Sequence, residues 1–455
     1  MNREMLRLAL PSILANLTVP LVGMVDIAIA GHLDSAAAAL IGGISVGSLM
    51  FDILYWNFGF LRAGTGGMCA QAYGRGDWKD CADNLTRGVG LALLIALGLI
   101  LLQWPFQKLI FLFVDCSDEV RQLALAYFYI RIWAAPATLS LMALRGWFIG
   151  MQDTFSSMLT DLVVNGGNIL FSLLLTFGIP GIGLEGIGYR GIAMGTVLAQ
   201  YGGLLCAGAI IFFKFRKVIN RSTVTFKSAF GPGKLAHFFS VNTDLFVRSL
   251  CLIIVYLGFT ALSARLGDTL LAACSIMLKL LLVFSYFTDG FAFAGEALTG
   301  KYTGMRDVRG VRGAVRCTFA WSMGIGLIFM GINHIAGAPA LRLMTSDATV
   351  IEAASAFLPW LVFIPLVGCP AFTWDGIYIG ATATKTMRNS NMGCVLAFFA
   401  VWFAGIWIFR PEGTAAAHLL FACYYAHLIF RSAYQTIFYR RAIIAPVAGE
   451  PDPRR

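Results

Sequence analysis

A few ionisable and amide side chains lie inside long apolar stretches of this chain, and Asp26 is the most isolated of them. Asp26 comes about five residues before the end of the first stretch, roughly 8 Å below a membrane surface if that stretch is a helix. An ionised carboxylate at that depth costs a few kcal/mol, so such residues usually face a water-filled cavity. A carboxyl group held there could take up and release a proton. An acid that only packs against helices, or that reaches the interface, is the competing interpretation.

The fifth apolar stretch carries a second polar group, formed by Asp161, Asn165, Asn168 and Ser172. Spacings of three and four residues put these side chains on one face of a helix. Ser172 lies at a depth similar to that of Asp26, and so does Thr196 on the sixth stretch. An acid, amides and hydroxyls can therefore meet in one bundle, although the same groups also form ordinary interhelical hydrogen bonds. Asp161 lies near the other end of its stretch, where we expect solvation.

The second half of the chain has its own charged residues at membrane depth: Arg248, Lys279, Asp289, Glu296 and Asp375. Asp289 and Glu296 are seven residues apart and share a helix face. Asp244 and Arg248 are four apart, which predicts a local ion pair. Because the charges nearly balance, internal pairing and a role in substrate binding or gating both stay open. If these residues line a water-filled cavity, the acids favour a cationic or amphiphilic substrate.

Two prolines, Pro11 and Pro20, lie in the same stretch as Asp26. Each removes a backbone hydrogen bond and permits a bend. A helix that bends and carries a titratable acid suits ion coupling, whereas the simpler interpretation is that prolines shape the packing of membrane helices.

The elements that position these residues are membrane helices. Hydrophobic residues make up 58% of the 455 residues and charged residues 13%, against about 25% charged residues in soluble proteins. The mean hydropathy is +0.76. Apolar stretches of 18 or more residues predict membrane-spanning helices, and we expect twelve. Gly150 and Gly380 end similar segments 230 positions apart, and such a repeat is typical of secondary transporters.

We therefore expect an N-terminal lobe of six helices at 1–213, a cytoplasmic linker at 214–235, a C-terminal lobe of six helices at 236–438 and a cytoplasmic tail at 439–455. Lysine and arginine concentrate in alternate loops, so the positive-inside rule puts both termini in the cytoplasm. This asymmetry explains the net charge of +10 without nucleic-acid binding. We expect a monomer in a bacterial inner (plasma) membrane.

The cysteines and histidines do not indicate a metal site. The ten cysteines contain no CxxC pair, and the five histidines are dispersed. We expect no cofactor. No cluster of nucleophiles or acid–base residues at a membrane face supports an integral-membrane enzyme.

Several motifs resemble the MATE (multidrug and toxic compound extrusion) transporters, and those of the second half resemble their DinF branch. They are Val25–Leu33, Ala70–Asp77, Gly150–Thr154, Ala264–Asp268, Asp289–Leu298 and Asp375–Gly380. The ordered set covers nearly the whole chain. The resemblance implies an all-α polytopic membrane protein with two six-helix lobes in a V around a central cavity. It also implies export driven by inward proton or sodium flow.

By this resemblance, Asp26 matches the family's first-helix acid and Pro11 the proline about which that helix is proposed to bend. Asn168 and Thr196 match its fifth-helix Asn and sixth-helix Thr. Ser172 departs from the pattern, because many members carry Asp there. The loss of an anionic ligand favours protons over sodium as the coupling ion, although a sodium site at Asp26, Asn168 and Thr196 stays open.

The sequence thus predicts a secondary active antiporter that exports cationic or amphiphilic organic compounds by alternating access. The ion-coupling residues would be Asp26, Asn165, Asn168, Ser172 and Thr196. The alternative within transport is a flippase for lipid-linked precursors, which should have a broadly basic cavity. An integral-membrane enzyme and a simple channel are less compatible with this sequence.

Overall fold

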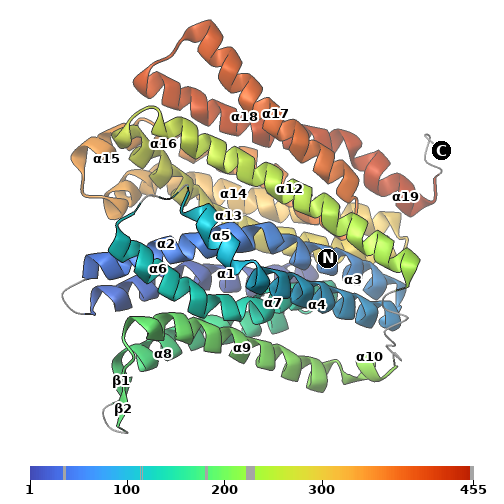
Figure 1. Cartoon of the computed structure of the whole chain (residues 1–455). Coiled ribbons are helices and arrows are strands. Elements are labelled where there is room, and N and C mark those ends of the chain that lie inside the picture. The colour runs from blue at the N-terminus through green and yellow to red at the C-terminus, as the bar shows by residue number, and fades with distance from the viewer. Residues whose placement is uncertain (34–36, 113, 115, 180–182, 222–230, 451–455) are drawn as a thin grey trace. The chain divides into compact units, whose positions relative to one another are not determined.

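The protein is described by a computed structural model over residues 1–33, 37–112, 114, 116–179, 183–221 and 231–450. Long helices joined by short connections dominate it (Figure 1). Twelve helical segments in the described residues are long and apolar enough to cross a membrane, which confirms the predicted number.

The first half of the chain supplies six of these spans. The helices are α1 (Asn2–Gly31), α2 (Ala37–Trp56), α3 (Phe60–Arg75), α4 (Trp78–Leu101), α5 (Gln103–Ile110), α6 (Asp118–Arg131), α7 (Ala135–Gly150), α8 (Thr154–Phe177), α9 (Tyr189–Lys214) and α10 (Arg216–Arg221). Short 3-10 turns join α2 to α3 and α6 to α7, so each pair forms one span. A small antiparallel hairpin, β1 (Gly178–Ile179) and β2 (Leu184–Glu185), connects α8 to α9.

The second half supplies the other six. Its helices are α12 (Pro232–Ala264), α13 (Asp268–Gly304), α14 (Val308–Met344), α15 (Ala348–Ser355), α16 (Leu358–Gly380), α17 (Thr384–Phe409) and α18 (Gly413–Tyr439). A π-helical turn (Arg440–Ile444) and α19 (Ala445–Ala448) continue α18.

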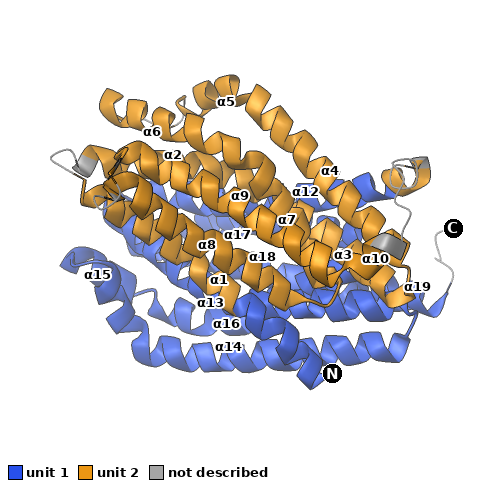
Figure 2. Cartoon of the chain, turned by 90° about the horizontal axis from the view of Figure 1, so that it is seen from below, with its two compact units in different colours: residues 1–13, 237–455 blue, residues 14–236 orange. Residues whose placement is uncertain are grey.

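The chain divides into two compact units (Figure 2). Unit 2 is Leu14–Ala236, and unit 1 combines Met1–Ile13 with His237–Arg455. Helix α1 therefore contributes its first residues to unit 1 and the rest to unit 2. Residues 222–230 of the predicted linker and 451–455 of the predicted tail lie outside the described residues.

The 230-residue repeat recurs in the helix starts. Asp77 caps α4 by accepting a hydrogen bond from the backbone N–H of Asp80, and Asp307 caps α14 by accepting one from Gly310. The preceding residues, Gly76 and Arg306, both have positive φ. A left-handed residue ends one helix, and an aspartate at the next position begins the following one.

The repeat also fixes the closest helix contacts inside each unit. A Cβ atom on Gly146 of α7 would lie 2.0 Å from the carbonyl oxygen of Arg62 on α3. A Cβ atom on Gly376 of α16 would lie 2.0 Å from the carbonyl oxygen of Ala292 on α13. These pairs occupy equivalent positions of the repeat, so both units use glycine where two backbones touch.

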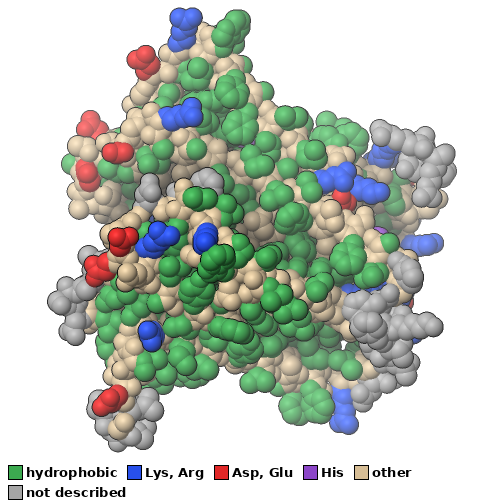
Figure 3. Space-filling model, in the orientation of Figure 1, with side chains coloured by type: hydrophobic (Ala, Val, Ile, Leu, Met, Phe, Trp, Pro, Cys, Tyr) green, Lys and Arg blue, Asp and Glu red, His purple; other side chains and the backbone are tan. Residues whose placement is uncertain are grey.

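The surface fits a lipid environment. Figure 3 shows hydrophobic side chains over much of the visible face. Large apolar residues such as Leu205 on α9 and Trp407 on α17 are 75% and 81% exposed, and a bilayer would cover them.

Candidate ion-coupling site

Asp26 lies on α1 inside unit 2 and is only 6% exposed. Its Oδ1 atom has no hydrogen-bond partner among the described residues. Ile29 and Ala30, the next turn of α1, pack into a buried cluster that we call the Tyr127 core: Ile29, Ala30, Ile44, Met50, Phe51, Leu54, Ile110, Tyr127, Phe128, Ile132, Ile192 and Ala193. A buried carboxyl oxygen without a partner is costly, so it is a candidate acceptor for a proton or cation.

Three of the predicted ion-coupling residues form one group between α8 and α9. Asn168 donates from Nδ2 to Oγ1 of Thr196 at 2.8 Å. Thr196 and Ser172 both donate to the carbonyl oxygen of Ile192, at 3.2 and 3.3 Å. Because Ile192 belongs to the Tyr127 core, this group lies against the same cluster as the Asp26 segment. The Oδ1 atom of Asn168 is buried without a partner, as is that of Asp26.

Asn165 forms its hydrogen bond with α1 and not with α9. Its Nδ2 atom donates to Oγ1 of Thr18 on α1 at 2.5 Å. Asn165 therefore joins α8 to the segment that carries Asp26 without joining the Asn168–Thr196 pair. No hydrogen bond links Asp26 to Asn165, Asn168, Ser172 or Thr196 in the described residues. Asp26 is related to the Asn168 group only because both lie beside the Tyr127 core.

Sequence reasoning missed two charged residues near Asp26. Arg131, the last residue of α6, interacts electrostatically with Asp26 and with Asp52 of α2. Its Nη1 atom donates to the Tyr127 hydroxyl at 2.9 Å and to Ser48 at 3.5 Å. Arg131 and Asp52 both interrupt apolar stretches, as Asp26 does. An inventory of every charged residue inside the predicted spans would therefore have found them.

Asp161 is not solvated, which corrects the expectation from its position near a helix end. It is 6% exposed and pairs with Arg145 of α7, with 2.5 Å between Nε and Oδ1. The partner is on another helix, so residue spacing within α8 could not reveal it.

The two prolines of α1 fall on opposite sides of the division between the units. Pro11 belongs to unit 1 and Pro20 to unit 2, and α1 is helical through both.

In unit 1, Asp375 of α16 lies between two arginines. Arg248 of α12 and Arg431 of α18 both form ion pairs with it, and Arg431 also donates from Nε at 3.0 Å. Arg431 is 2% exposed. This internal triad has two cations for one carboxylate. Asp375 lies 230 residues after Arg145, so the two residues occupy equivalent positions of the repeat.

The predicted local pair between Asp244 and Arg248 is wrong. Asp244 instead accepts from Arg388 at 2.7 Å and from the Thr384 hydroxyl at 2.9 Å, both on α17. Arg248 turns to Asp375. Buried charges select partners that complete a network across helices, and a spacing of four residues on one helix does not decide that choice.

The predicted charges of α13 do not form a single group. Glu296 is fully buried and Asp289 partly buried, whereas Lys279 is exposed. Lys279 and Glu296 are separated by about 25 Å along the helix, at 1.5 Å per residue.

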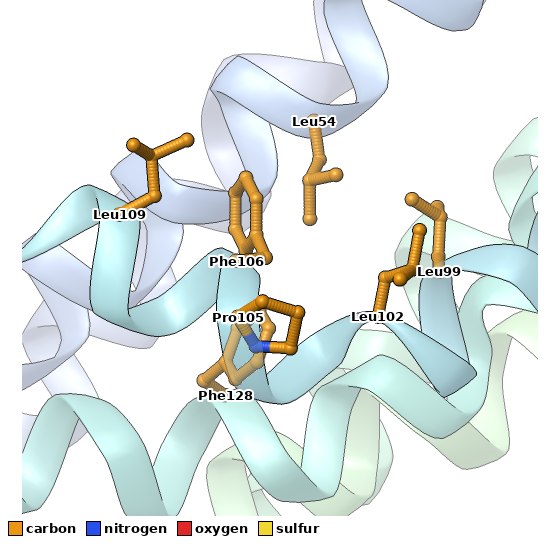
Figure 4. Close-up of a pocket in the computed structure, with 7 residues that line it drawn as sticks. All are labelled: Leu54, Leu99, Leu102, Pro105, Phe106, Leu109 and Phe128. Atoms are coloured by element: carbon orange, nitrogen blue, oxygen red, sulfur yellow. The ribbon is translucent and has the colours of Figure 1, made fainter.

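An apolar pocket of about 320 Å³ lies in unit 2 between α2, α4, α5 and α6 (Figure 4). Its lining residues are Leu54, Leu99, Leu102, Pro105, Phe106, Leu109 and Phe128. None of the predicted site residues contributes to it.

Comparison with known protein families identifies the family to which this chain belongs. The MatE family model matches residues 11–174 and 245–404, one segment in each half. The chain belongs to the MatE family. Membership makes it a membrane transporter and not an enzyme, and confirms the resemblance inferred from the motifs.

Individual relatives agree with this assignment. The MATE chain is 34% identical over 400 residues to DNA damage-inducible protein F of Escherichia coli K12, covering 88% of this chain and 85% of that protein. It is 23% identical to a probable multidrug resistance protein NorM of Photorhabdus laumondii, over 89% and 86% of the two chains. The bent form of the Vibrio cholerae MATE transporter VcmN superposes with a TM-score of 0.82 at 16% identity, over 99% and 98%. The structural likeness confirms the predicted fold class.

Proposed function

We propose that this MATE transporter is a secondary active antiporter that exports cationic or amphiphilic organic compounds in exchange for protons, by alternating access. The observation that carries the proposal is the buried carboxyl group of Asp26, whose Oδ1 atom lacks a hydrogen-bond partner in the described residues. Such a group can bind a proton from one side of the membrane and release it to the other. A relative named as a probable multidrug resistance protein supports the class of substrate.

The local chemistry favours a proton over sodium. Ser172 supplies a hydroxyl where many family members carry a second carboxylate, so this group offers one fewer anionic ligand. Sodium held by Asp26, Asn168 and Thr196 is the alternative, because Asn168 has an unsatisfied acceptor oxygen.

We assign the residues of unit 1 to gating and substrate contact. Asp375 and Arg248 are held in a buried network with Arg431, which suits a structural element that moves as a body. Lys279 is exposed on α13 and is the residue of this set best able to meet a substrate, with Asp289 and Glu296 further along the same helix. Pro11 and Pro20 would let α1 bend between the units.

For localisation, we propose a bacterial inner (plasma) membrane with both termini in the cytoplasm and a monomeric transporter. The predicted lobes, 1–213 and 236–438, would be the two halves that exchange access. The asymmetry of lysine and arginine between alternate loops supports this orientation.

The test is transport in proteoliposomes with pH and sodium gradients imposed separately. The wild-type protein should transport an organic cation under a pH gradient without sodium. Asp26→Asn should abolish this coupled transport while the protein stays inserted and monodisperse, because the amide cannot release a proton. Full gradient-driven transport by a properly inserted Asp26→Asn variant would refute the role of Asp26. A wild-type requirement for sodium, with no response to a pH gradient, would refute proton coupling.

A further inference from the structure

Asp52 is an exposed acid in the middle of an apolar helix. It lies on α2 about 20 Å from the start of a span that begins at Ala39, at 1.5 Å per residue. An ionised carboxylate facing hydrocarbon at that depth would cost several kcal/mol. A water-filled pathway beside Asp52 would remove this cost, and there the carboxylate could meet a charged molecule.

Arg131 on α6, also about 20 Å from the start of its span at Asp118, interacts electrostatically with this acid. Its guanidinium group is held mainly by neutral groups: the Tyr127 hydroxyl at 2.9 Å, the Ser48 hydroxyl at 3.5 Å and the face of the Phe51 ring at 4.8 Å. It interacts electrostatically with both Asp26 and Asp52. In the described residues the guanidinium group of Arg131 lies within 4.0 Å of neither carboxylate, so it forms an ion pair with neither Asp26 nor Asp52.

Among the described residues, the other ionisable groups around Arg131 and Tyr127 are tyrosines. They are Tyr55 on α2, Tyr127 on α6 and Tyr189 on α9, and tyrosine ordinarily loses its proton only near pH 10. On α8, Asp161 is already paired with Arg145. One arginine therefore serves two carboxylates, one buried and one exposed.

We propose that Arg131 is shared alternately between Asp26 and Asp52 and thereby makes proton binding and substrate binding mutually exclusive. When Asp26 is ionised, Arg131 pairs with it, and Asp52 is free to bind the positively charged group of a substrate. When a proton neutralises Asp26, Arg131 is released to Asp52 and displaces the substrate cation. Asp52 is then a substrate-binding residue for organic cations, and Arg131 a positioning residue.

This inference rests on the proposed coupling role of Asp26. It explains antiport by linkage: if a proton weakens substrate binding by a given factor, the substrate weakens proton binding by the same factor. The proton and the substrate need not bind at the same place, because Arg131 can pair with only one of the two acids at a time and so couples the two binding sites.

The experiment measures binding of tetraphenylphosphonium, a lipophilic organic cation, to purified full-length protein in detergent without any gradient. The pH series runs between about pH 6 and pH 8, above the range in which an exposed aspartate ordinarily titrates. Wild-type affinity should fall at least tenfold from the highest to the lowest pH. Arg131→Gln should keep strong binding at low pH and flatten the profile, whereas Arg131→Lys should retain the fall because it keeps the charge.

The acids give separate signatures. Asp52→Asn should weaken binding most at high pH, where Asp52 is free to bind the cation in the wild type, and Asp26→Asn should hold the protein at the weak affinity of the protonated form. Arg145→Gln is the matched control, because it removes an arginine of unit 2 that pairs with a different buried acid, Asp161, and its profile should follow the wild type.

A wild-type pH profile in Arg131→Gln, or wild-type affinity in Asp52→Asn, would overturn the shared-arginine mechanism. If Arg131→Gln does not fold, the comparison of Asp52→Asn, Asp26→Asn and Arg131→Lys still decides it. Loss of coupled transport in Asp26→Asn together with an unchanged Arg131→Gln profile would leave the proposed function standing and reject this inference alone. Retained coupled transport in Asp26→Asn would reject the coupling role of Asp26 on which this inference rests.

Discussion

The buried triad of unit 1 allows a quantitative test through Asp375→Asn. The substitution keeps the shape of the side chain but removes the only carboxylate that pairs with Arg248 and Arg431 among the described residues. Breaking a buried ion pair from one side costs about 3–5 kcal/mol, because an uncompensated charge stays behind. Asparagine can still accept the hydrogen bond from Arg431, and the Arg248 side chain is 19% exposed. We therefore expect a loss near the lower limit, about 3 kcal/mol.

Thermal unfolding of the detergent-solubilised protein measures this loss. For a cooperative unit of 150–250 residues, each kcal/mol lowers Tm by about 2–4 °C, so Asp375→Asn should lower it by roughly 6–12 °C. Arg75→Gln breaks the pair with Asp80, in which the Arg75 side chain is 44% exposed. That control should cost at most about 1 kcal/mol.

A second variant distinguishes electrostatics from packing. Adding Arg248→Gln to Asp375→Asn removes one of the two uncompensated cations, so the double variant should melt at a higher temperature than Asp375→Asn alone. A Tm of Asp375→Asn within about 2 °C of the wild type would refute the reasoning. A double variant that melts still lower would show that packing, and not unpaired charge, governs this site.

Three further changes test other parts of the molecule. Ser172→Asp adds the carboxylate that the family resemblance implies at this position, so it should raise sodium affinity or move the pH optimum of transport upward, measured in sodium-free and sodium-loaded vesicles; an unchanged response to both ions would count against the assigned site. Glu296→Gln should alter substrate profile or transport kinetics more than ion affinity, and a change confined to ion affinity would mean that the roles of the two halves are reversed. Gly376→Ala should destabilise by about 1–3 kcal/mol or more, because its Cβ would lie 2.0 Å from the Ala292 carbonyl oxygen; Gly202→Ala on α9, with nothing within 4 Å, is the control and should leave Tm unchanged or raise it.

Several features of the site follow directly from the sequence. Asn168, Ser172 and Thr196 converge as the helical spacing predicts, because residues three and four apart share a face and α8 packs against α9. Asp26 is buried as its apolar surroundings predict. The partners of the buried charges were not predictable in this way. Arg145 and Arg131 reach their acids from other helices.

The sequence by itself determined the number of spans, the 230-residue repeat and the family, because apolar length, turn residues and motif order are local properties of the chain. Only the tertiary structure decided which charges meet. Asp244 and Arg248 are neighbours on one helix, yet each pairs with a residue more than a hundred positions away. The physical reason is that a charge inside a membrane protein lowers its free energy by completing a buried network, and such networks form wherever helices pack, independently of distance along the chain.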